Sequence, residues 1–324
     1  MKTDSFSGPL FLIGIGRSGT KLLRDLLNQN PRIGIPIAES NFIPIMIKKY
    51  GNPPHFDNDT EFQSFYEEYT KTSFFWWMKK FDCVMSKDFL NKNADKNSWR
   101  SIFEVILRYH VLPGRDKDFI WGDKTPSYLY HIDLLNELYP RARFLHIIRD
   151  PRDCCISTQK AWGTNLFTVA DGWRRGVEVA RTSGKQLGNN YMEVYYESLI
   201  DDPEKTLINI CEFLGCEFAS VMMQLGRDTE NLGEAKGKTR IVRHNKKKYT
   251  DQLSITEIRR IEEIVYPVME STQYEFEYAV SYRPLSNIKL RIYSRVNKWN
   301  RLMFDLKTKG LVEGIKYHFG TLKN

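Results

Sequence analysis

The strongest constraint on the fold is a glycine-rich loop that joins an apolar strand to a helix near the start of the chain. Residues 9–15 form a short apolar run beside glycines, a pattern typical of a buried strand. Residues 18–29 place leucines at helical spacing. Backbone N–H groups converge in such a loop, and the helix dipole adds positive potential. The loop is therefore expected to hold an anion.

The side chains of the loop narrow the kind of anion. A magnesium–nucleotide P-loop reads GxxxxGK[ST], and the spacing from Gly14 to Gly19 fits it. Thr20, however, stands where that motif needs lysine, and Lys21 stands where it needs the hydroxyl that binds magnesium. A P-loop kinase is thus an alternative, although the residues at positions 20 and 21 do not match its motif. The loop offers an anion the side chains of Arg17, Ser18 and Thr20.

The rest of the chain alternates strands and helices. Strands are predicted at 119–122, 142–148 and 191–195, and helices at 18–29, 127–138, 167–188, 255–271 and from 151. Two helix starts carry caps: Asp202-Pro203-Glu204, and a capping box from Ser254 to Glu257. Alternating strands and helices predict an α/β fold of three layers around a central parallel sheet.

Composition divides the chain into a main domain and a basic extension. Residues 281–324 carry ten Lys and Arg and two acids, so their charge of +8 equals that of the whole chain and residues 1–280 are neutral. Within this domain, residues 51–117 are rich in aromatics and predict a helical insertion, either ordinary core or a lid that binds the acceptor. A neutral domain without a recognised nucleic-acid motif argues against the second alternative function, nucleic-acid binding.

The extension contains a basic amphipathic helix over residues 285–306. Such a helix could pack on the domain, form a homodimer, or lie on an anionic membrane. The five cysteines include no CxxC pair, which predicts neither a disulfide framework nor a zinc cluster. No apolar run approaches the length of a membrane span or a signal peptide. We expect a cytoplasmic protein, peripheral to a membrane at most.

A second candidate phosphate site follows the strand at 142–148. Arg149 comes at the carboxyl end of this strand, the edge where open α/β sheets bind ligands. Ser157 lies about two turns into the next helix, so both side chains could share one phosphate. The alternative is a surface Arg and a serine that faces its own helix.

Taken together, these motifs resemble those of sulfotransferases that use 3′-phosphoadenosine-5′-phosphosulfate (PAPS). The loop 16–20 resembles the 5′-phosphosulfate motif, and Arg149 with Ser157 resembles the 3′-phosphate motif. Further stretches are similar to bacterial members and to the tyrosylprotein sulfotransferase branch: 196–197, 202–204, 213–215, 30–40 and 122–126. The resemblance covers about residues 9–275 and implies a P-loop-like fold.

The resemblance also implies which residues bind the donor. The phosphosulfate would contact Arg17, Ser18, Gly19 and Thr20. The 3′-phosphate would bind Arg149 and Ser157, and Tyr196 would lie near the adenine. Many relatives have a second Thr where this chain has Lys21, which would contact the sulfuryl oxygens or face outward. In relatives a basic loop closes over the donor, and residues 236–248 hold seven Lys and Arg and no acid.

Sulfuryl transfer requires a base, charge stabilisation and in-line reactants. By the resemblance the base is Glu39, and burial can raise the pKa of a glutamate toward neutrality. The alternative for Glu39 is a helix-opening residue held by the dipole. Lys124, at the same sheet edge as Arg149, would neutralise developing charge together with Arg17. His55, His110 and His131 match no motif, and no metal is expected. The acceptor is expected to be a hydroxyl of a carbohydrate, lipid or small metabolite rather than a protein tyrosine.

Overall fold

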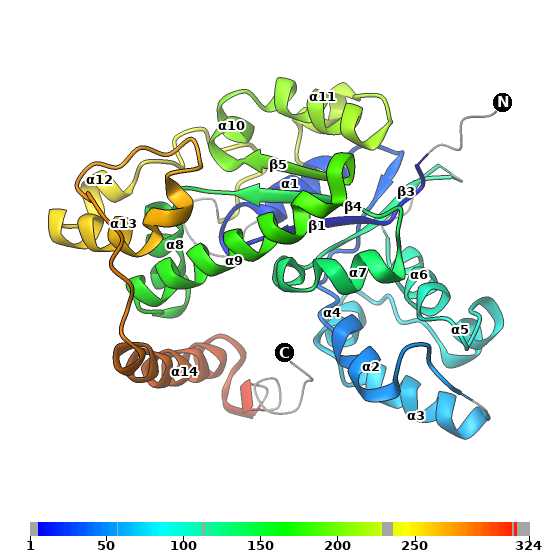
Figure 1. The fold of residues 1–324 in the computed structure, drawn as a ribbon. Coiled ribbons are helices and arrows are strands. Elements are labelled where there is room, and N and C mark those ends of the chain that lie inside the picture. Colours follow the sequence, from blue (N-terminus) through cyan, green and yellow to red (C-terminus); the bar gives the residue numbers. More distant parts are fainter. Residues whose placement is uncertain are drawn as a thin grey trace.

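The structure is a computed structural model that describes residues 6–56, 58–111, 114–116, 118–228, 236–312 and 314–315. The two ends of the chain and parts of the expected insertion and extension lie outside this description. Within the described residues, five parallel strands form one sheet in the order β2-β3-β1-β4-β5 (Figure 1). Their bounds are β1 Leu10–Gly14, β2 Ile33–Gly34, β3 Ile120–Lys124, β4 Arg143–Ile148 and β5 Tyr191–Tyr195.

The expected α/β class with a parallel sheet is confirmed, and one strand was missed. β2 is only two residues long, too short for a periodic pattern, and it pairs with β3 through Ile33 and Gly34. Lys124 is the last residue of β3 rather than a residue after the strand. β1 lies at the centre, paired with β3 on one side and β4 on the other, so the glycine loop leaves from the middle of the sheet.

Alternating side chains of the strands build two cores, one on each face of the sheet. Leu10 and Leu12 of β1 point into the core formed with α1 (Thr20–Leu27), α10 (Tyr196–Asp201) and α11 (Pro203–Leu214). Phe11 and Ile13 point into the opposite core. Because successive side chains of a strand face opposite ways, this arrangement makes three layers, as predicted.

The second face is covered by helices from several parts of the chain (Figure 1). Four of them belong to the predicted helical insertion: α3 Asp59–Thr70, α4 Ser73–Lys80, α5 Lys87–Asn93 and α6 Trp99–Tyr109. Beside them lie α2 Ile43–Tyr50, the 3₁₀ turn η1 Pro126–Tyr130, α7 Ile132–Leu138 and α9 Leu166–Leu187. A third core joins α9 to α8 (Pro151–Trp162) and α13 (Ile255–Met269).

The predicted helix starts are confirmed by their caps. The Asp202 side chain accepts a hydrogen bond from the Lys205 N–H at 3.2 Å, and Ser254 and Glu257 form the capping box. The remaining short helical turns are η2 Gly188–Asn190, η3 Ser220–Met223 and α12 Tyr249–Gln252. The basic helix α14 spans Asn287–Lys309 and lies along the edge of the molecule (Figure 1). None of the helices in the described part of the chain is both long and apolar enough to cross a bilayer.

Candidate active site

The glycine loop packs tightly between β1 and α1. Gly19 begins α1 in the left-handed region (φ +95°), and a Cβ there would lie 2.4 Å from the Tyr196 ring. A Cβ on Gly14 would lie 2.7 Å from a backbone oxygen of β4. Both positions therefore require glycine. Arg17 also has a positive φ of 72°, a conformation that is uncommon for a residue with a side chain and concentrates at functional sites.

Four predicted donor-binding residues meet beside this loop. Arg17 Nε donates a hydrogen bond to Ser157 Oγ at 3.2 Å. Arg149 Nη1 donates to the backbone oxygen of Arg17 at 3.1 Å, and its guanidinium lies 4.3 Å from the centre of the Tyr196 ring. The loop, the residue after β4, α8 and α10 thus each contribute one member of a single cluster.

Arg149 is buried, with 3% of its surface exposed. Its Nη2 donates to the backbone oxygen of Asn245 at 2.8 Å, and the Asn245 side chain donates to the Tyr196 hydroxyl at 2.7 Å. Asn245 lies within the basic segment 236–248. Because its side chain is an uncharged amide, the basic character of that segment does not single it out. Among the described residues, Arg149 Nε has no hydrogen-bond partner. A buried donor without a partner is typical of a site that receives an anion.

Glu39 and Lys124 form an ion pair of 2.5 Å at the same edge of the sheet. The Lys124 side chain is 1% exposed and that of Glu39 is 38% exposed. Burial would raise the pKa of Glu39, but the attraction and hydrogen bond of Lys124, with smaller effects of Lys21 and Arg24, bring it below its ordinary value. Burial likewise lowers the pKa of Lys124, against the opposing effect of Glu39. The expectation that burial would raise the pKa of Glu39 omitted this partner.

Polar side chains of α1 and of the residue that caps its end hold the segment that leads to Glu39. Arg24 Nη1 donates to the backbone oxygen of Ile37 at 2.5 Å. The Asn28 amide donates to the Ile35 oxygen at 2.8 Å and accepts from the Ile35 N–H at 2.9 Å. The segment 35–37 has no regular secondary structure, so its backbone groups have no partners in a β-sheet. The hydrogen bonds from Arg24 and Asn28 satisfy some of these groups instead. On a sequence, Arg24 and Asn28 look like ordinary polar positions of a helix.

The residue after Glu39 is fixed to β3 by a buried network. The Ser40 N–H donates to Thr125 Oγ1 at 2.9 Å, and Ser40 Oγ donates to Asp123 at 3.1 Å. Ser40 Oγ also lies 2.6 Å from the Tyr128 hydroxyl. Burial raises the pKa of Asp123 to about 6, although these hydroxyls and Lys124 oppose the rise. The backbone of Glu39 is thus held by contacts of the residues before and after it, while its carboxylate lines the pockets described next.

Two pockets meet at Lys21, Glu39 and Asn41. The first, about 520 Å³, is lined by the glycine loop, η1 and Trp162 of α8. The second, about 440 Å³, lies between Lys124 and the insertion, whose Trp77 and Phe81 line it. Lys21, whose orientation the sequence left open, faces both.

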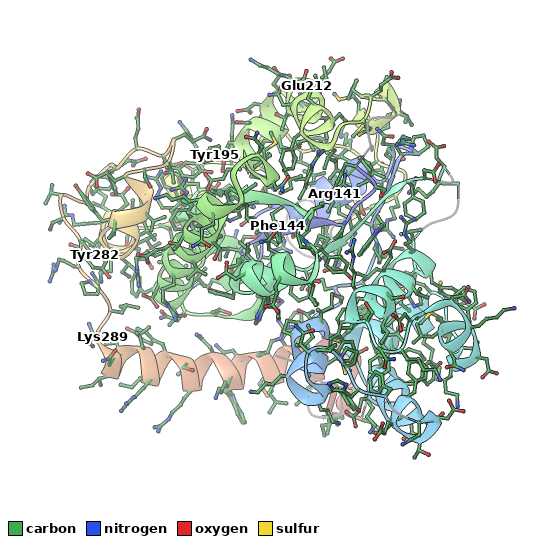
Figure 2. The ribbon with its side chains drawn as sticks, turned by 45° about the vertical axis from the view of Figure 1, so that its right-hand side comes forward. Arg141, Phe144, Tyr195, Glu212, Tyr282 and Lys289 are labelled. Carbon is green, nitrogen blue, oxygen red and sulfur yellow. The ribbon has the colours of Figure 1, made fainter. Side chains whose placement is uncertain are left out.

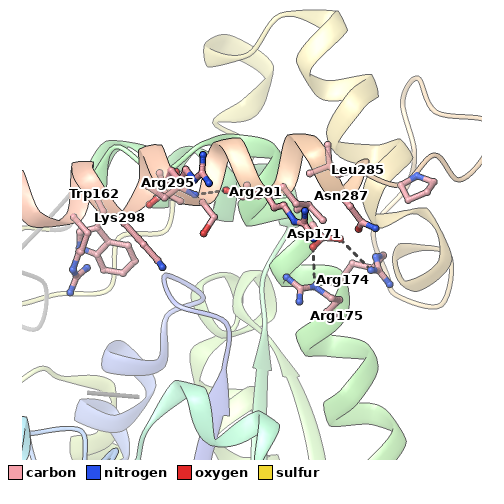
Figure 3. Close-up of a pocket in the computed structure, with 16 residues that line it drawn as sticks. Trp162, Asp171, Arg174, Arg175, Leu285, Asn287, Arg291, Arg295 and Lys298 are labelled. Carbon is pink, nitrogen blue, oxygen red and sulfur yellow. Dashed lines mark hydrogen bonds and ion pairs between the residues drawn. The ribbon is translucent and has the colours of Figure 1, made fainter. Parts of the chain in front are cut away.

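A third and larger cavity, about 1030 Å³, lies between α14 and helices α8 and α9 (Figure 3). It borders the first pocket, since Trp162 and Arg301 line both. Its cationic lining residues are Arg174, Arg175, Arg291, Arg295, Lys298 and Arg301. Asp171 of α9 forms ion pairs with Arg174 at 3.2 Å and with Arg175 at 2.9 Å. Packing on the domain was one of the three alternatives for the basic helix, but its sequence does not indicate where on the domain it would pack.

The three candidate histidines, His55, His110 and His131, do not line any of these three cavities. His110, at the end of α6, is buried and its Nε2 lies 3.0 Å from the Tyr69 hydroxyl, and burial lowers its pKa to about 4. His131 precedes α7, and His55 is exposed. Across the ranges that the structure describes, no group of three or more metal-ligating side chains occurs.

Known proteins are similar to this chain in sequence. The chain is 24% identical over 246 residues to nodulation protein NoeE of Sinorhizobium fredii, covering 68% of this chain and 53% of that protein. It is 25% identical over 225 residues to protein-tyrosine sulfotransferase 2 of Gallus gallus, covering 66% of this chain and 53% of that protein. The match thus spans about half the length of these curated relatives.

A solved structure shows the same fold. The sulfotransferase domain of the olefin synthase from Synechococcus PCC 7002 aligns with a TM-score of 0.51 at 20% identity, over 81% of this chain and 96% of that chain. The model of the sulfotransferase family matches residues 9–220, well over half of the sequence. That range includes the glycine loop, Glu39, Lys124 and Arg149 with Ser157. The chain therefore belongs to the sulfotransferase family.

Proposed function

We propose that this protein transfers a sulfuryl group from PAPS to the hydroxyl of an acceptor and releases 3′,5′-ADP. The observation that carries the proposal is the ion pair of Glu39 and Lys124, which lies where the pocket of the glycine loop meets a second pocket. A donor in the first pocket and an acceptor in the second would meet at these two side chains. Family membership supports this reaction over the kinase and nucleic-acid alternatives.

The residues around the loop fit the donor. Loop residues would hold the phosphosulfate, namely Arg17, Ser18, Gly19 and Thr20. Arg149 and Ser157 would bind the 3′-phosphate, and the unpartnered Arg149 Nε is a donor available for it. Tyr196, stacked on Arg149, would border the adenine. A Cβ on Gly16 would meet only the Trp162 ring, at 3.7 Å, so the loop leaves open space on this side.

The catalytic roles follow from charge and position. Glu39 would accept the acceptor's hydroxyl proton as the new O–S bond forms and the S–O bond to the phosphate breaks. Lys124, Arg17 and Lys21 would stabilise the charge on the sulfuryl and the departing phosphate. Because the pKa of Glu39 is lowered, its carboxylate is already deprotonated at neutral pH. It becomes a stronger base once the hydrogen bond from Lys124 turns to the reacting oxygens.

The acceptor is proposed to be a carbohydrate, lipid or small metabolite hydroxyl. The insertion 51–117 would bind it, because Trp77 and Phe81 line the same pocket as Lys124. Aromatic surfaces stack on sugar rings and apolar chains alike. Several similar proteins are named as protein-tyrosine sulfotransferases, but at 25% identity or less a shared fold does not establish a shared acceptor.

The reaction can be tested by transfer of labelled sulfate. The full chain is incubated with radiolabelled PAPS and fractionated carbohydrates, lipids, small metabolites and peptides, and the labelled product is identified by mass. We expect label in a non-peptide fraction, suppressed by excess 3′,5′-ADP. Label confined to peptides would reject the acceptor class, and no label in any fraction, with the donor bound, would reject transfer to these acceptors.

A further inference from the structure

The outward face of α14 is apolar. Its large side chains on this face are between 46% and 71% exposed, and they are Ile288, Ile292, Val296, Trp299 and Met303. At 3.6 residues per turn they share one side of the helix, which we name the apolar stripe. The stripe spans about 22 Å at a rise of 1.5 Å per residue. Soluble monomers rarely expose a contiguous apolar surface of this kind, and those that do use it for binding.

The opposite side of α14 attaches the helix to the body through Leu290, which packs against the third core, and through polar contacts. The Asn297 side chain donates to Thr168 Oγ1 and accepts from the Asn165 N–H, both at 2.9 Å. Asn300 donates to the backbone oxygen of Gly163 at 2.6 Å. The helix thus exposes five large apolar side chains of a kind that an amphipathic helix usually turns inward. The contacts fix the apolar stripe on the outside, and Figure 2 shows side chains of α14 projecting away from the rest of the molecule.

Cations flank the apolar stripe on both sides. By helical spacing, Lys289 and Lys307 lie along one edge, and the other edge carries Arg291, Arg295 and Lys298. These last three side chains also line the cavity between α14 and the body (Figure 3). The single acid within the bounds of α14, Asp305, is buried. The exposed surface of this helix is therefore apolar at its centre and positive at its edges.

We propose that α14 docks on the surface of a membrane that contains anionic phospholipids. Its apolar stripe would enter the boundary between headgroups and acyl chains, and the flanking cations would contact lipid phosphates. Charge selects this partner over a second copy of the chain, because two facing stripes would bring the same cations together. Arg301 of this helix also lines the pocket of the glycine loop, so docking holds that pocket close to the lipid surface.

The test is cosedimentation of the full chain with vesicles of phosphatidylcholine, with and without phosphatidylglycerol. We expect binding only to the vesicles that contain phosphatidylglycerol, and its loss when Ile292, Val296 and Trp299 are changed to Gln. The matched control changes three exposed apolar residues elsewhere to Gln, and it keeps binding: Val221, Ile255 and Val280. All these sites are exposed, so thermal unfolding is expected to stay near that of the wild type.

A second variant tests the role of charge. Changing Arg291, Arg295 and Lys298 to Gln is expected to weaken partitioning on the order of a hundredfold, since each cation near an anionic surface contributes several-fold. The control changes Lys92, Lys185 and Lys205, which are exposed elsewhere. Equal sedimentation with both vesicle types, or full binding by the stripe variant, would overturn the proposal. So would a dimer in light scattering that the stripe variant dissociates, because the surface would then belong to a second copy.

Discussion

Glu39 and Lys124 adjust each other's protonation. Burial alone would favour a protonated Glu39 and a neutral Lys124, whereas their 2.5 Å contact favours the charged pair. The pair keeps the carboxylate deprotonated and ready to accept a proton. It also holds the Lys124 ammonium near the position where negative charge would develop on the sulfuryl group and the departing phosphate. Substitutions of the two residues are thus expected to have different effects on the kinetics.

Replacing Glu39 with Gln removes the proposed base and keeps the shape of the side chain. We expect kcat to fall by about 10²–10⁴, the usual contribution of a positioned base, while the KM for PAPS changes little. Steady-state kinetics measures both constants. The control is Glu212→Gln, an exposed glutamate of α11. A wild-type kcat in the Glu39 variant would remove Glu39 from the chemistry.

Replacing Lys124 with Met removes the partner that lowers the pKa of Glu39. Burial, which raises that pKa, then acts with less opposition. The acid limb of the kcat/KM profile is expected to move to higher pH, in addition to a general loss of rate of about 10²–10³. The measurement is a pH–rate profile of both proteins. An acid limb that stays in place would mean that another group controls it.

Part of the site could be predicted from neighbouring residues alone. Local sequence patterns predict anion binding by Arg17, which lies in a glycine loop, and by Arg149, which follows an apolar strand. Asn245 could not be found this way, because its role comes from contacts with two elements distant in the sequence. The same is true of Arg24 and Asn28, which look like surface positions until the chain returns past them.

At the scale of elements, the insertion supplies a wall of the second pocket. Trp77 of α4 lines this pocket, whereas its neighbour Trp76 lines none of the three cavities. Trp77→Leu is therefore expected to raise the KM for the acceptor about tenfold, as expected for lost aromatic contact, without changing the KM for PAPS. Trp76→Leu is the matched control. Equal effects on both substrates would indicate a general disturbance of α4.

Long elements were predictable and short or non-local ones were not. The apolar run of β4 and the leucine spacing of α1 each identify their element without help from the fold. β2 has two residues and exists only because it lies beside β3. For α14, periodicity predicted a helix, but it did not show that five large apolar side chains would stay exposed while Asn297 and Asn300 contact α9 and the end of α8.

At the scale of the whole molecule, the buried carboxyl of Asp123 is expected to make the free energy of unfolding depend on pH. Burial raises the pKa of Asp123 to about 6 from an ordinary 3.8, so the folded protein binds a proton more tightly than the unfolded chain. Stability should therefore rise as pH falls through the folded pKa toward the unfolded one. Relative to Asp123→Asn, the unfolding free energy should gain about 2 kcal/mol between about pH 7.5 and about pH 4.5.

Urea unfolding of both proteins across this pH range measures the difference, in which most other titrating groups cancel. The control is Asp251→Asn, an exposed aspartate of α12. If the difference between the wild type and Asp123→Asn does not change with pH, the Asp123 carboxyl does not change protonation on folding.

The central claim for the whole molecule is that its glycine loop and Arg149 cluster bind a donor with two separate phosphate sites. Titration calorimetry with 3′,5′-ADP tests this directly, with magnesium–ATP as the comparison. We predict binding of 3′,5′-ADP, weakened about tenfold or more in Ser157→Ala by loss of a hydrogen bond to a charged group, and weak or absent binding of magnesium–ATP. Binding of magnesium–ATP without binding of 3′,5′-ADP would contradict the account.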